Sequence, residues 1–340
     1  MKYKHIVISQ FGGSENLLLV EDDLREPGPN EVRVKVLSAG VSFADLFMRQ
    51  GVHPESWNLG RTPFTPGWDI VGVVDKLGNK VSTWHLGQIV TALPVVGGYS
   101  EYIFMSSNDL VAVPIGLDPA EVVSVVLNYI TAYQMLHRCA HIKSGESVLI
   151  NGGAAGGVGT ALLQLGKLVN LDKMFGTASA EKHGIVSDLG GIPIDYKSVD
   201  LGQEIVKLTS HNDNQPGVDA VFDGIGGKSF KTSYEILHSG GRLVAYGGTP
   251  TADLGEWLMM FTMNVVSDKK KFILYSIQTL KRVNPAWFHE DLILLLDLLK
   301  QGKIKPVVGA RMPLDQAAKA HELLASGSVK GKIVLICNNW

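Results

Sequence analysis

The chain has only two cysteines, Cys139 and Cys337, among its 340 residues. A scaffold held by several disulfides is therefore excluded. An excess of one charge is also absent, because 31 Lys and Arg residues nearly balance 33 Asp and Glu residues and leave a formal net charge of −2. A basic surplus would favour a nucleic-acid partner and a long charged run would favour a disordered tail. We expect neither.

Long hydrophobic runs are missing as well. The longest nearly apolar stretches, around residues 122–130 and 292–299, are interrupted by Asn128 and Asp297 and are too short to cross a bilayer. The N-terminal residues contain no apolar segment followed by a small-residue cleavage site. We therefore expect a cytoplasmic protein with no membrane partner. The length exceeds the usual size of a single core and favours two domains.

One segment carries a ligand-binding signature. An apolar run over residues 147–150 is followed by small residues and then by a helical pattern, with Gly156 and Gly159 at the second and third positions of G-x-G-x-x-G and Ala154 in place of the first glycine. Such a turn lets backbone N–H groups approach a pyrophosphate, at which the following helix directs its positive end. We assign the phosphate contacts to Ala155, Gly156, Gly157, Val158 and Gly159.

The surrounding pattern supports a nucleotide-binding fold. Residues 161–169 place apolar side chains on one face of a predicted helix. Short runs typical of β-strands follow at 174–178 and 192–196. Two further runs, 219–223 and 242–246, each end in glycines, and the second is followed by Gly247. This alternation predicts an α/β domain with a doubly wound parallel sheet. Its ligand crevice would lie at the carboxyl ends of the strands, where we place Gly247 as a cofactor contact.

The segment before the glycine-rich turn is rich in β-strands and turns. Alternating polar and apolar residues at 31–36 predict a half-buried strand, and Asp118 and Pro119 have the character of a helix start. This pattern predicts a β-barrel domain. The further strands we expect are 70–74, 89–93, 99–104 and 110–113.

The C-terminal segment predicts two helices, at 285–300 and 315–325, and a last strand at 332–336. We expect this tail to return to the N-terminal domain. The predicted organisation is a first part of the catalytic domain at 1–122, a nucleotide-binding domain at 123–272 and a return to the catalytic domain at 273–340.

Several motifs along nearly the whole chain occur in the order of one known family. They are Ala39–Asp45 with Arg49–Gly51, Thr65–Asp69 with Gly72, Gly97–Tyr102, Ile130–Tyr133, Ala154–Gly159 and Gly331–Leu335. Through them the chain resembles the zinc-independent quinone oxidoreductase (zeta-crystallin-like) branch of the medium-chain dehydrogenase/reductase superfamily. The resemblance implies a GroES-like catalytic domain, a Rossmann domain, an active-site cleft between them and frequent dimers.

We expect no catalytic metal. Where zinc-bearing relatives place their first ligand this chain has Ser42, and where a His-Glu pair would follow it has Trp68-Asp69. Serine and tryptophan cannot replace thiolate and imidazole as zinc ligands. A rival pair, His137 and His141, shares one helical face but lacks a third ligand nearby. Those histidines are more simply explained by a helix C-terminus, where they favour the negative end of the dipole.

The second strand of the nucleotide fold suggests the cofactor. NAD sites usually end that strand with Asp or Glu, which binds the ribose 2′-hydroxyl, whereas this chain ends it with Ala178 and Ser179. Ser179, Lys182 and Tyr196 could hydrogen-bond a 2′-phosphate instead, which predicts NADPH. An inward-turned Glu181 would weaken that preference, and Lys182 has the alternative role of a solvated lysine at a helix start.

Four residues are candidates for catalysis. Ser42 is predicted to donate a hydrogen bond near the substrate or the nicotinamide, with an ordinary turn serine as the alternative. Asp45 resembles a family position near the cleft or else caps the helix that begins there. Asn128 interrupts an apolar stretch, so its amide contacts either backbone or ligand. The resemblance places Thr131 beside the nicotinamide.

The outer parts of the predicted site are less specific. His53 and Tyr99 could line the cofactor edge, although a lone histidine is more often structural. Among the tryptophans, only Trp68 is expected near the cleft. The way in which residues 249–271 fold over the site would influence the choice of acceptor.

The leading functional hypothesis is an NADPH-dependent reductase that transfers hydride to a quinone or a related activated carbonyl acceptor, working as a homodimer. Two alternatives remain open. One is reduction of the double bond of enones or 2-alkenals, and the other is a non-catalytic nucleotide-binding scaffold, because fold alone does not fix function.

Overall fold

The structure, a computed structural model, describes residues 1–60, 62–210, 216–247 and 269–338. It divides into two compact units, which we call the terminal unit (residues 1–128 and 289–340) and the central unit (residues 129–288). The C-terminal tail therefore belongs to the same unit as the N-terminal segment. The domain boundaries at 122/123 and 272/273 stay predictions. Most of the 249–271 segment lies outside the described residues.

The terminal unit is built on a seven-stranded, mainly antiparallel sheet with a separate hairpin. The sheet order is β14-β15-β3-β4-β5-β7, with β6 also paired to β3. Val32, Val34 and Val36 alternate with polar residues along β3 and are fully buried, as the sequence pattern predicts. The strands are β1 (Lys2–Ile8), β2 (Leu17–Asp23), β3 (Glu31–Val41), β4 (Ile70–Leu77), β5 (Ile89–Ala92), β6 (Tyr102–Ser106), β7 (Val111–Ala112), β14 (Val308–Pro313) and β15 (Lys332–Ile336).

The last strand ties the two chain segments of this unit together. β15 runs antiparallel to β3, with Ile333 opposite Val41, and its side chains join the core formed by β3 and β4. The helices are α1 (Phe43–Gln50), α2 (Pro54–Leu59), α3 (Pro119–Ser124) and α12 (Ala317–Ala325). The predicted helix start at Asp118 is confirmed, because its carboxylate accepts a hydrogen bond from the Ala120 N–H at 3.0 Å.

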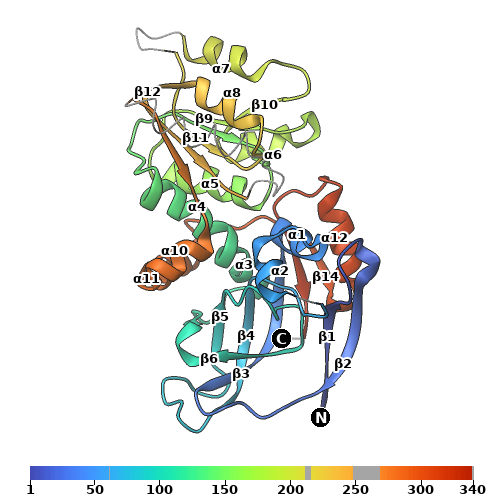
Figure 1. Cartoon of the computed structure of the whole chain (residues 1–340). Coiled ribbons are helices and arrows are strands. Elements are labelled where there is room, and N and C mark those ends of the chain that lie inside the picture. The colour runs from blue at the N-terminus through green and yellow to red at the C-terminus, as the bar shows by residue number, and fades with distance from the viewer. Residues whose placement is uncertain (61, 211–215, 248–268, 339–340) are drawn as a thin grey trace. The chain divides into compact units, whose positions relative to one another are not determined.

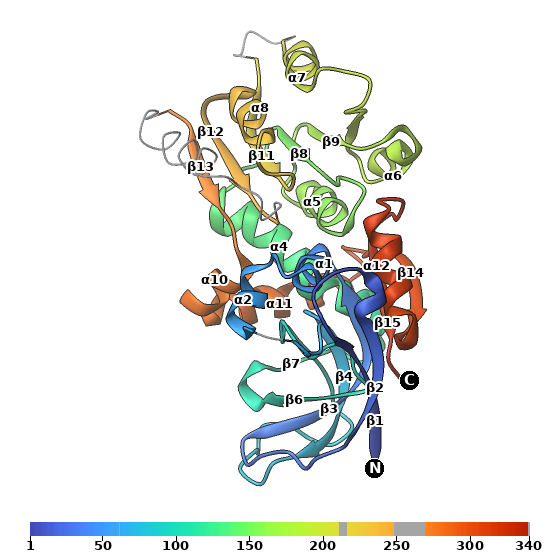
Figure 2. The same cartoon turned by 45° about the vertical axis from the view of Figure 1, so that its right-hand side comes forward.

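The central unit is a six-stranded parallel sheet with helices on both faces. Its order, β10-β9-β8-β11-β12-β13, is that of a dinucleotide-binding Rossmann sheet, which confirms the predicted fold class. Figures 1 and 2 show α5 and α6 on one face and α7 and α8 on the other. The strands are β8 (Val148–Asn151), β9 (Met174–Thr177), β10 (Ile192–Ile194), β11 (Val218–Asp223), β12 (Leu237–Ala245) and β13 (Lys271–Leu274).

Four helices of this unit connect successive strands, as parallel pairing requires: α5 (Gly157–Leu168), α6 (His183–Asp188), α7 (Leu201–Thr209) and α8 (Ser229–Glu235). α4 (Ile130–Tyr133) precedes the first strand, α10 (Ile277–Val283) follows the last, and α11 (Pro285–Lys300) crosses the boundary between the units. α4 lies between two π-helical segments, Val125–Tyr129 and Gln134–Cys139.

Most of the predicted strands have other limits in the structure, and hydrogen bonds explain two of the differences. The run predicted at 99–104 forms a strand only from Tyr102, because the Ser100 hydroxyl bonds the Gly97 and Tyr102 carbonyls in a local turn. The run predicted at 192–196 ends at Ile194. There the Asp195 carboxylate accepts a hydrogen bond from the Lys197 N–H at 3.0 Å, which starts a turn.

Candidate functional site

The glycine-rich turn joins β8 to α5 at the carboxyl edge of the central sheet. Gly152 and Gly153 have φ values of +91° and +73°, which L side chains rarely adopt, so the chain reverses sharply after Asn151. Gly156 is the residue that precedes α5, and no side chain caps the helix there. The N–H groups of the first turn can therefore meet an anion, whereas the Gly156 N–H donates to the Gly153 carbonyl at 2.7 Å. The phosphate contacts of residues 155–159 stay a prediction.

Gly159 lets helix and turn approach each other closely. A Cβ at this position would lie 2.2 Å from the Gly153 carbonyl oxygen and 2.5 Å from Ala154 Cα, both of them backbone atoms. Ala154, which replaces the first glycine of the motif, is fully buried. Its methyl group fits because β9 has Gly176 opposite, where a Cβ would come within 2.7 Å of Ala154 Cβ.

A buried polar cluster stands beside this turn, and the sequence patterns did not predict it. Asp223, at the end of β11, accepts hydrogen bonds from the Ser229 and Ser233 hydroxyls, both at 2.6 Å, and from the Ile225 and Gly226 N–H groups. The Asn151 amide joins the same cluster. The bonds shape the turn after β11 and connect it to the end of β8. The sequence does contain one signal for this cluster: Asn151 and Asp223 are polar residues that end two neighbouring parallel strands.

The end of β9 carries the predicted 2′-phosphate contacts. Ser179 follows β9 closely, but its hydroxyl donates a hydrogen bond to Glu181 Oε1 at 2.9 Å. Glu181 is exposed, and this bond lowers the pKa of its carboxyl, with smaller contributions from Lys197 and Lys182. The Glu181 carboxylate, which would weaken a preference for NADPH, thus accepts a hydrogen bond from Ser179, one of the residues predicted to bind the 2′-phosphate.

Tyr196 and a second lysine lie on the neighbouring strand end. Tyr196 is 56% exposed, and its ring centroid lies 5.9 Å from Lys197 Nζ. Lys197 is a cation that the sequence patterns did not single out, although it directly follows a predicted ligand. Gly247 lies just past β12 with a φ of +57°, and a Cβ added there would meet no atom of the described residues within 4 Å. Its cofactor contact stays a prediction.

In the terminal unit, Ser42 and Asp45 form a reciprocal cap at the start of α1. The Ser42 hydroxyl and N–H donate to Asp45 Oδ2 at 2.6 and 2.9 Å, and Asp45 Oδ1 accepts from the Gly67 N–H at 3.1 Å. The alternative that Asp45 caps this helix is therefore corrected: Ser42 occupies the capping position, and Asp45 is its partner three residues later.

Burial determines the protonation of Asp45. Its carboxyl is fully buried, which raises its pKa to about 7, and the neighbouring Asp69 adds to the shift, while hydrogen bonds from Ser42 and the charge of Lys332 oppose it. The group thus changes charge near neutral pH. The folded state binds a proton that an unfolded aspartate has already released, so stability falls as pH rises from about 4 to above 7.

Replacing Asp45 with asparagine is therefore expected to remove a pH-dependent part of the stability. Between pH 5 and pH 8 the wild type should lose about 2–3 kcal/mol of unfolding free energy through this group, and D45N should lack that loss. Urea unfolding at the two pH values measures the difference. The matched control is D315N, at an exposed aspartate in the same unit, which should keep the wild-type slope.

Asp69 and Lys332 form a buried ion pair. Lys332 Nζ lies 2.8 Å from Asp69 Oδ2, and both side chains are almost completely buried. Gly40 leaves the room for this contact, because a Cβ there would come within 2.3 Å of Lys332 Cε and 2.4 Å of Asp69 Oδ1. The pair joins β15, from the C-terminal tail, to the segment that precedes β4.

Three aromatic residues expected near the cleft are held by the protein itself. His53 precedes α2, and its Nδ1 accepts a hydrogen bond from the Glu55 N–H at 3.1 Å. The Trp68 indole is buried and donates to Met48 Sδ. Tyr99 is fully buried, with its hydroxyl 3.2 Å from His321 Nε2, so the expectation that it lines a cofactor edge is wrong. The cofactor role of His53 stays a prediction.

Asn128 and Thr131 lie on the helical segment that links the units. Each is only 6% exposed, and Asn128 belongs to a π-helical turn, a local distortion often found at functional sites. Their catalytic roles stay predictions. Farther along, the segment ends at Cys139, and His137 in its last turn lies against Tyr133, with 4.3 Å between the ring centroids.

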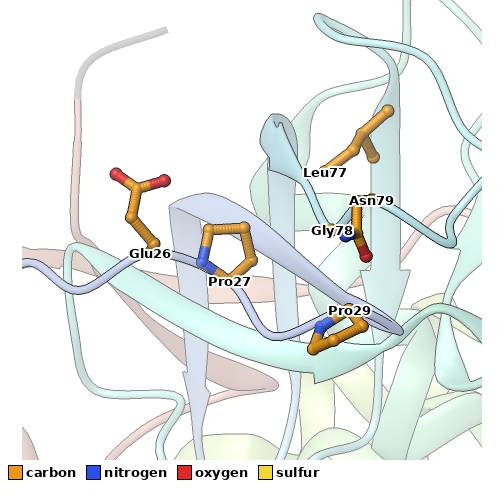
Figure 3. Close-up of a pocket in the computed structure, with 6 residues that line it drawn as sticks. All are labelled: Glu26, Pro27, Pro29, Leu77, Gly78 and Asn79. Carbon is orange, nitrogen blue, oxygen red and sulfur yellow. The ribbon is translucent and has the colours of Figure 1, made fainter.

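We searched the described residues for a metal cluster, a membrane-spanning helix and a further pocket. No group of three or more His, Cys, Asp or Glu side chains with the geometry to hold a metal ion is found among them. Within the same ranges, every helix is too short or too polar to span a membrane. Figure 3 shows a surface hollow in the terminal unit whose one charged side chain, Glu26, pairs with Lys76 at 2.6 Å. The hollow is lined by Glu26, Pro27, Pro29, Leu77, Gly78 and Asn79.

Two protein families match parts of the chain. A family described as alcohol dehydrogenase GroES-like domain matches residues 28–115. A family described as zinc-binding dehydrogenase matches residues 192–335.

Similar proteins cover nearly the whole chain. The synaptic vesicle membrane protein VAT-1 homolog of Danio rerio is 32% identical over 98% of this chain and 70% of its own length. The quinone oxidoreductase of Lama guanicoe is 30% identical over 97% of this chain and 96% of its own length.

Solved structures show the same fold. The Escherichia coli quinone oxidoreductase complexed with NADPH superposes with a TM-score of 0.86 at 26% identity, over 98% of this chain and 99% of that one. The CurK enoyl reductase gives a TM-score of 0.86 at 26% identity, with the same coverage.

Proposed function

This chain belongs to the quinone oxidoreductase family of the medium-chain dehydrogenase/reductase superfamily, and from that premise we propose that it is an NADPH-dependent reductase of quinones. Membership of this family makes it an oxidoreductase. The proposal adds the cofactor, the acceptor class and the absence of a zinc requirement.

One observation carries the choice of cofactor. The uncapped first turn of α5 lies at the edge of the sheet. The adjacent β9 ends at Thr177 and is followed by Ala178, with no carboxylate at the position that binds a ribose 2′-hydroxyl in NAD sites. Ser179, Lys182, Tyr196 and Lys197 then supply hydroxyls and positive charge for a 2′-phosphate. A quinone oxidoreductase of the same fold has been solved with NADPH.

The residues of the terminal unit fit a mechanism without zinc. NADPH, when bound, supplies the hydride. Ser42 offers a hydroxyl that can donate a hydrogen bond to the acceptor oxygen as negative charge develops on it, which replaces the Lewis acid of a metal enzyme. Because Ser42 has a single hydroxyl proton, it can donate to the acceptor only when Asp45, whose pKa is raised to about 7, is protonated and donates in turn to Ser42 Oγ across the 2.6 Å pair. Zinc independence rests on the residue types, since Ser42 and Trp68 are not zinc ligands.

The K182A variant tests the cofactor assignment. Loss of a charge-assisted bond of about 1.5–3 kcal/mol should raise the KM for NADPH by about tenfold to 150-fold and leave the KM for NADH nearly unchanged. Steady-state kinetics with NADPH and with NADH measure the change in each KM. K231A, at an exposed lysine of α8, is the matched control. Equal changes for NADPH and NADH would contradict the assignment.

The acceptor class is tested with two panels of substrates. NADPH oxidation is followed with 9,10-phenanthrenequinone and 1,2-naphthoquinone and, separately, with enones and 2-alkenals. Hydroquinone or semiquinone products support the proposal. A saturated carbonyl product with inactive quinones would favour the alternative of double-bond reduction, to which the similarity to an enoyl reductase gives weight. Tight NADPH binding without turnover would favour the scaffold.

We also propose that the chain forms a homodimer through the edge of the central sheet. β13 is the last strand in the sheet order and pairs with β12 alone among the described strands, and its Leu274 is 58% exposed. An exposed apolar edge strand favours pairing with another copy. L274E is therefore expected to convert a dimer into a monomer in light scattering coupled to gel filtration, whereas L86E, at an exposed leucine of the terminal unit, should not.

A further inference from the structure

We propose that Glu181 sets the choice between NADPH and NADH, because its carboxylate occupies the place that the 2′-phosphate takes when NADPH binds. The inference rests on the proposed function, whose cofactor it concerns, and it makes Glu181 a specificity-determining residue. NADPH has to displace this carboxylate, whereas NADH can bind with the carboxylate in place. The reductase therefore accepts both cofactors, and Glu181 limits its preference for NADPH.

A short helical turn after β9 brings Glu181 back to the end of that strand. β9 ends at Thr177, and the turn Ala180–Lys182 follows Ser179. The Lys182 N–H closes the turn, because it donates to the Ser179 carbonyl at 2.8 Å. Glu181 follows Thr177 by four positions, yet its side chain reaches Ser179. A carboxylate thus stands beside the end of β9, although the strand itself ends without one.

The Ser179 hydroxyl has one proton to donate, and Glu181 accepts it. The hydrogen bond from Ser179 Oγ to Glu181 Oε1 is 2.9 Å long. A carboxylate and a phosphate are both anionic oxygen acceptors, so they compete for this donor. The 2′-phosphate therefore gains the Ser179 hydroxyl only when Glu181 turns away. The Glu181 side chain is exposed, so water can solvate the carboxylate once it has turned.

The positive charge near the turn is shared in the same way. Lys182 belongs to the turn, and Lys197 lies just past the end of β10, the strand that pairs with β9. The Ala178 N–H joins the two strand ends, because it donates to the Ile194 carbonyl at 3.0 Å. Hydrogen bonds first, and then the charges of Lys197 and Lys182, lower the pKa of the Glu181 carboxyl. The ionised carboxylate therefore offsets part of the charge that a 2′-phosphate would meet.

The two cofactors meet this carboxylate differently. The 2′-phosphate, like other phosphate monoesters, carries a charge of about −1.5 to −2 at pH 7, so the carboxylate repels it. A ribose 2′-hydroxyl is instead a donor, and NAD sites use a carboxylate after the second strand to accept from it. Glu181 in its bonded position thus favours NADH. In an outward position it leaves Ser179 and the two lysines to NADPH.

The test compares E181Q with E235Q, at an exposed glutamate of α8 in the same unit. Glutamine keeps an oxygen that can accept from Ser179 but removes the charge. The ligands are 2′,5′-ADP and 5′-AMP, which differ only in the 2′-phosphate, and calorimetric titration measures both affinities. E181Q should bind 2′,5′-ADP about 3- to 10-fold more tightly than the wild type, because one repulsive charge is removed. Its affinity for 5′-AMP should stay the same or fall, and E235Q should match the wild type.

The same change should appear with the whole cofactors. In fluorescence titration of E181Q, the ratio of the Kd for NADH to the Kd for NADPH should rise at least about threefold. The gain should shrink in about 1 M salt, where charges are screened within about 3 Å, and a packing effect would not shrink. An unchanged affinity of E181Q for 2′,5′-ADP, or an equal gain for 5′-AMP, would overturn the inference.

S179A tests the donor for which carboxylate and phosphate compete. Loss of the hydroxyl should weaken the binding of 2′,5′-ADP by about 10-fold or more and leave 5′-AMP unaffected. S187A, at an exposed serine of α6, is the matched control. Wild-type affinity of S179A for 2′,5′-ADP would overturn the inference, because Glu181 would then hold a group that the phosphate does not need.

These titrations need no turnover, so they keep the inference separate from the proposed function. A wild type that reduces no quinone would contradict the proposed function, whereas the affinity of E181Q for 2′,5′-ADP would still decide the role of Glu181. A wild type that binds neither 2′,5′-ADP nor 5′-AMP would contradict both the cofactor assignment and the inference.

Discussion

Replacing Gly159 with alanine is expected to abolish measurable NADPH binding at micromolar concentrations. The added Cβ would meet the Gly153 carbonyl oxygen at 2.2 Å and Ala154 Cα at 2.5 Å. Neither backbone atom can move without opening the turn that presents the α5 amides. A misfit of about 1–3 kcal/mol confined to the binding conformation weakens affinity about 5- to 150-fold, before any loss of phosphate contacts. Fluorescence titration with NADPH measures the change.

The matched control for this substitution is G184A. Gly184 lies in α6 of the same unit, and within the part of the chain that the structure describes nothing comes within 4 Å of a Cβ there. An alanine in this helix should be tolerated or slightly stabilising. Undiminished NADPH affinity in a folded G159A, checked by circular dichroism, would contradict the assignment of the turn as the phosphate site.

The second large effect is expected from K332M. Removing the ammonium group leaves the Asp69 carboxylate buried without its cation, and breaking a buried pair in this way costs about 3–5 kcal/mol. Urea unfolding of the full chain measures the loss. K330M, at a less buried lysine two residues earlier, should change the unfolding free energy by less than about 0.5 kcal/mol.

A double variant distinguishes the ion pair from packing. D69N combined with K332M removes both charges, so it should be more stable than K332M alone, as is found when both partners of a buried pair are neutralised. If K332M and the double variant are equally unstable, the loss comes from the lysine's methylene packing and the ion-pair explanation fails.

Elements that depend on local chemistry could be predicted from the sequence. The limits of β15 agree with the predicted 332–336, and Asp118 caps α3 as expected. The glycine-rich turn between β8 and α5 also follows from neighbouring residues, because backbone freedom at Gly152 and Gly153 and the small size of Gly159 are properties of the residues themselves. Periodicity and turn residues act within a few positions, so one sequence contains their whole signal.

The candidate catalytic residues were only partly predictable. Ser42 and Asp45 were identified, but the sequence left Ser42 as a donor or an ordinary turn serine and Asp45 as a cleft residue or cap, whereas Ser42 is the N-cap of α1 and Asp45 its partner. The bond from Ser179 to Glu181 depends on how one exposed side chain turns, which no periodicity encodes. The Asp223 cluster draws its donors from β8, the following turn and α8, and the polar residues involved are ordinary in sequence.

By itself the sequence determined the α/β architecture, the glycine-rich turn between β8 and α5 and the absence of a carboxylate after the second strand of the nucleotide fold. Tertiary structure alone decided which buried charges meet. Tyr99 and His321 are 222 positions apart, and Asp69 and Lys332 are 263 apart. Such pairs form because β15 and α12 pack on the N-terminal sheet, and the burial that this packing causes shifts the pKa of Tyr99, His321 and Asp69 away from its ordinary value.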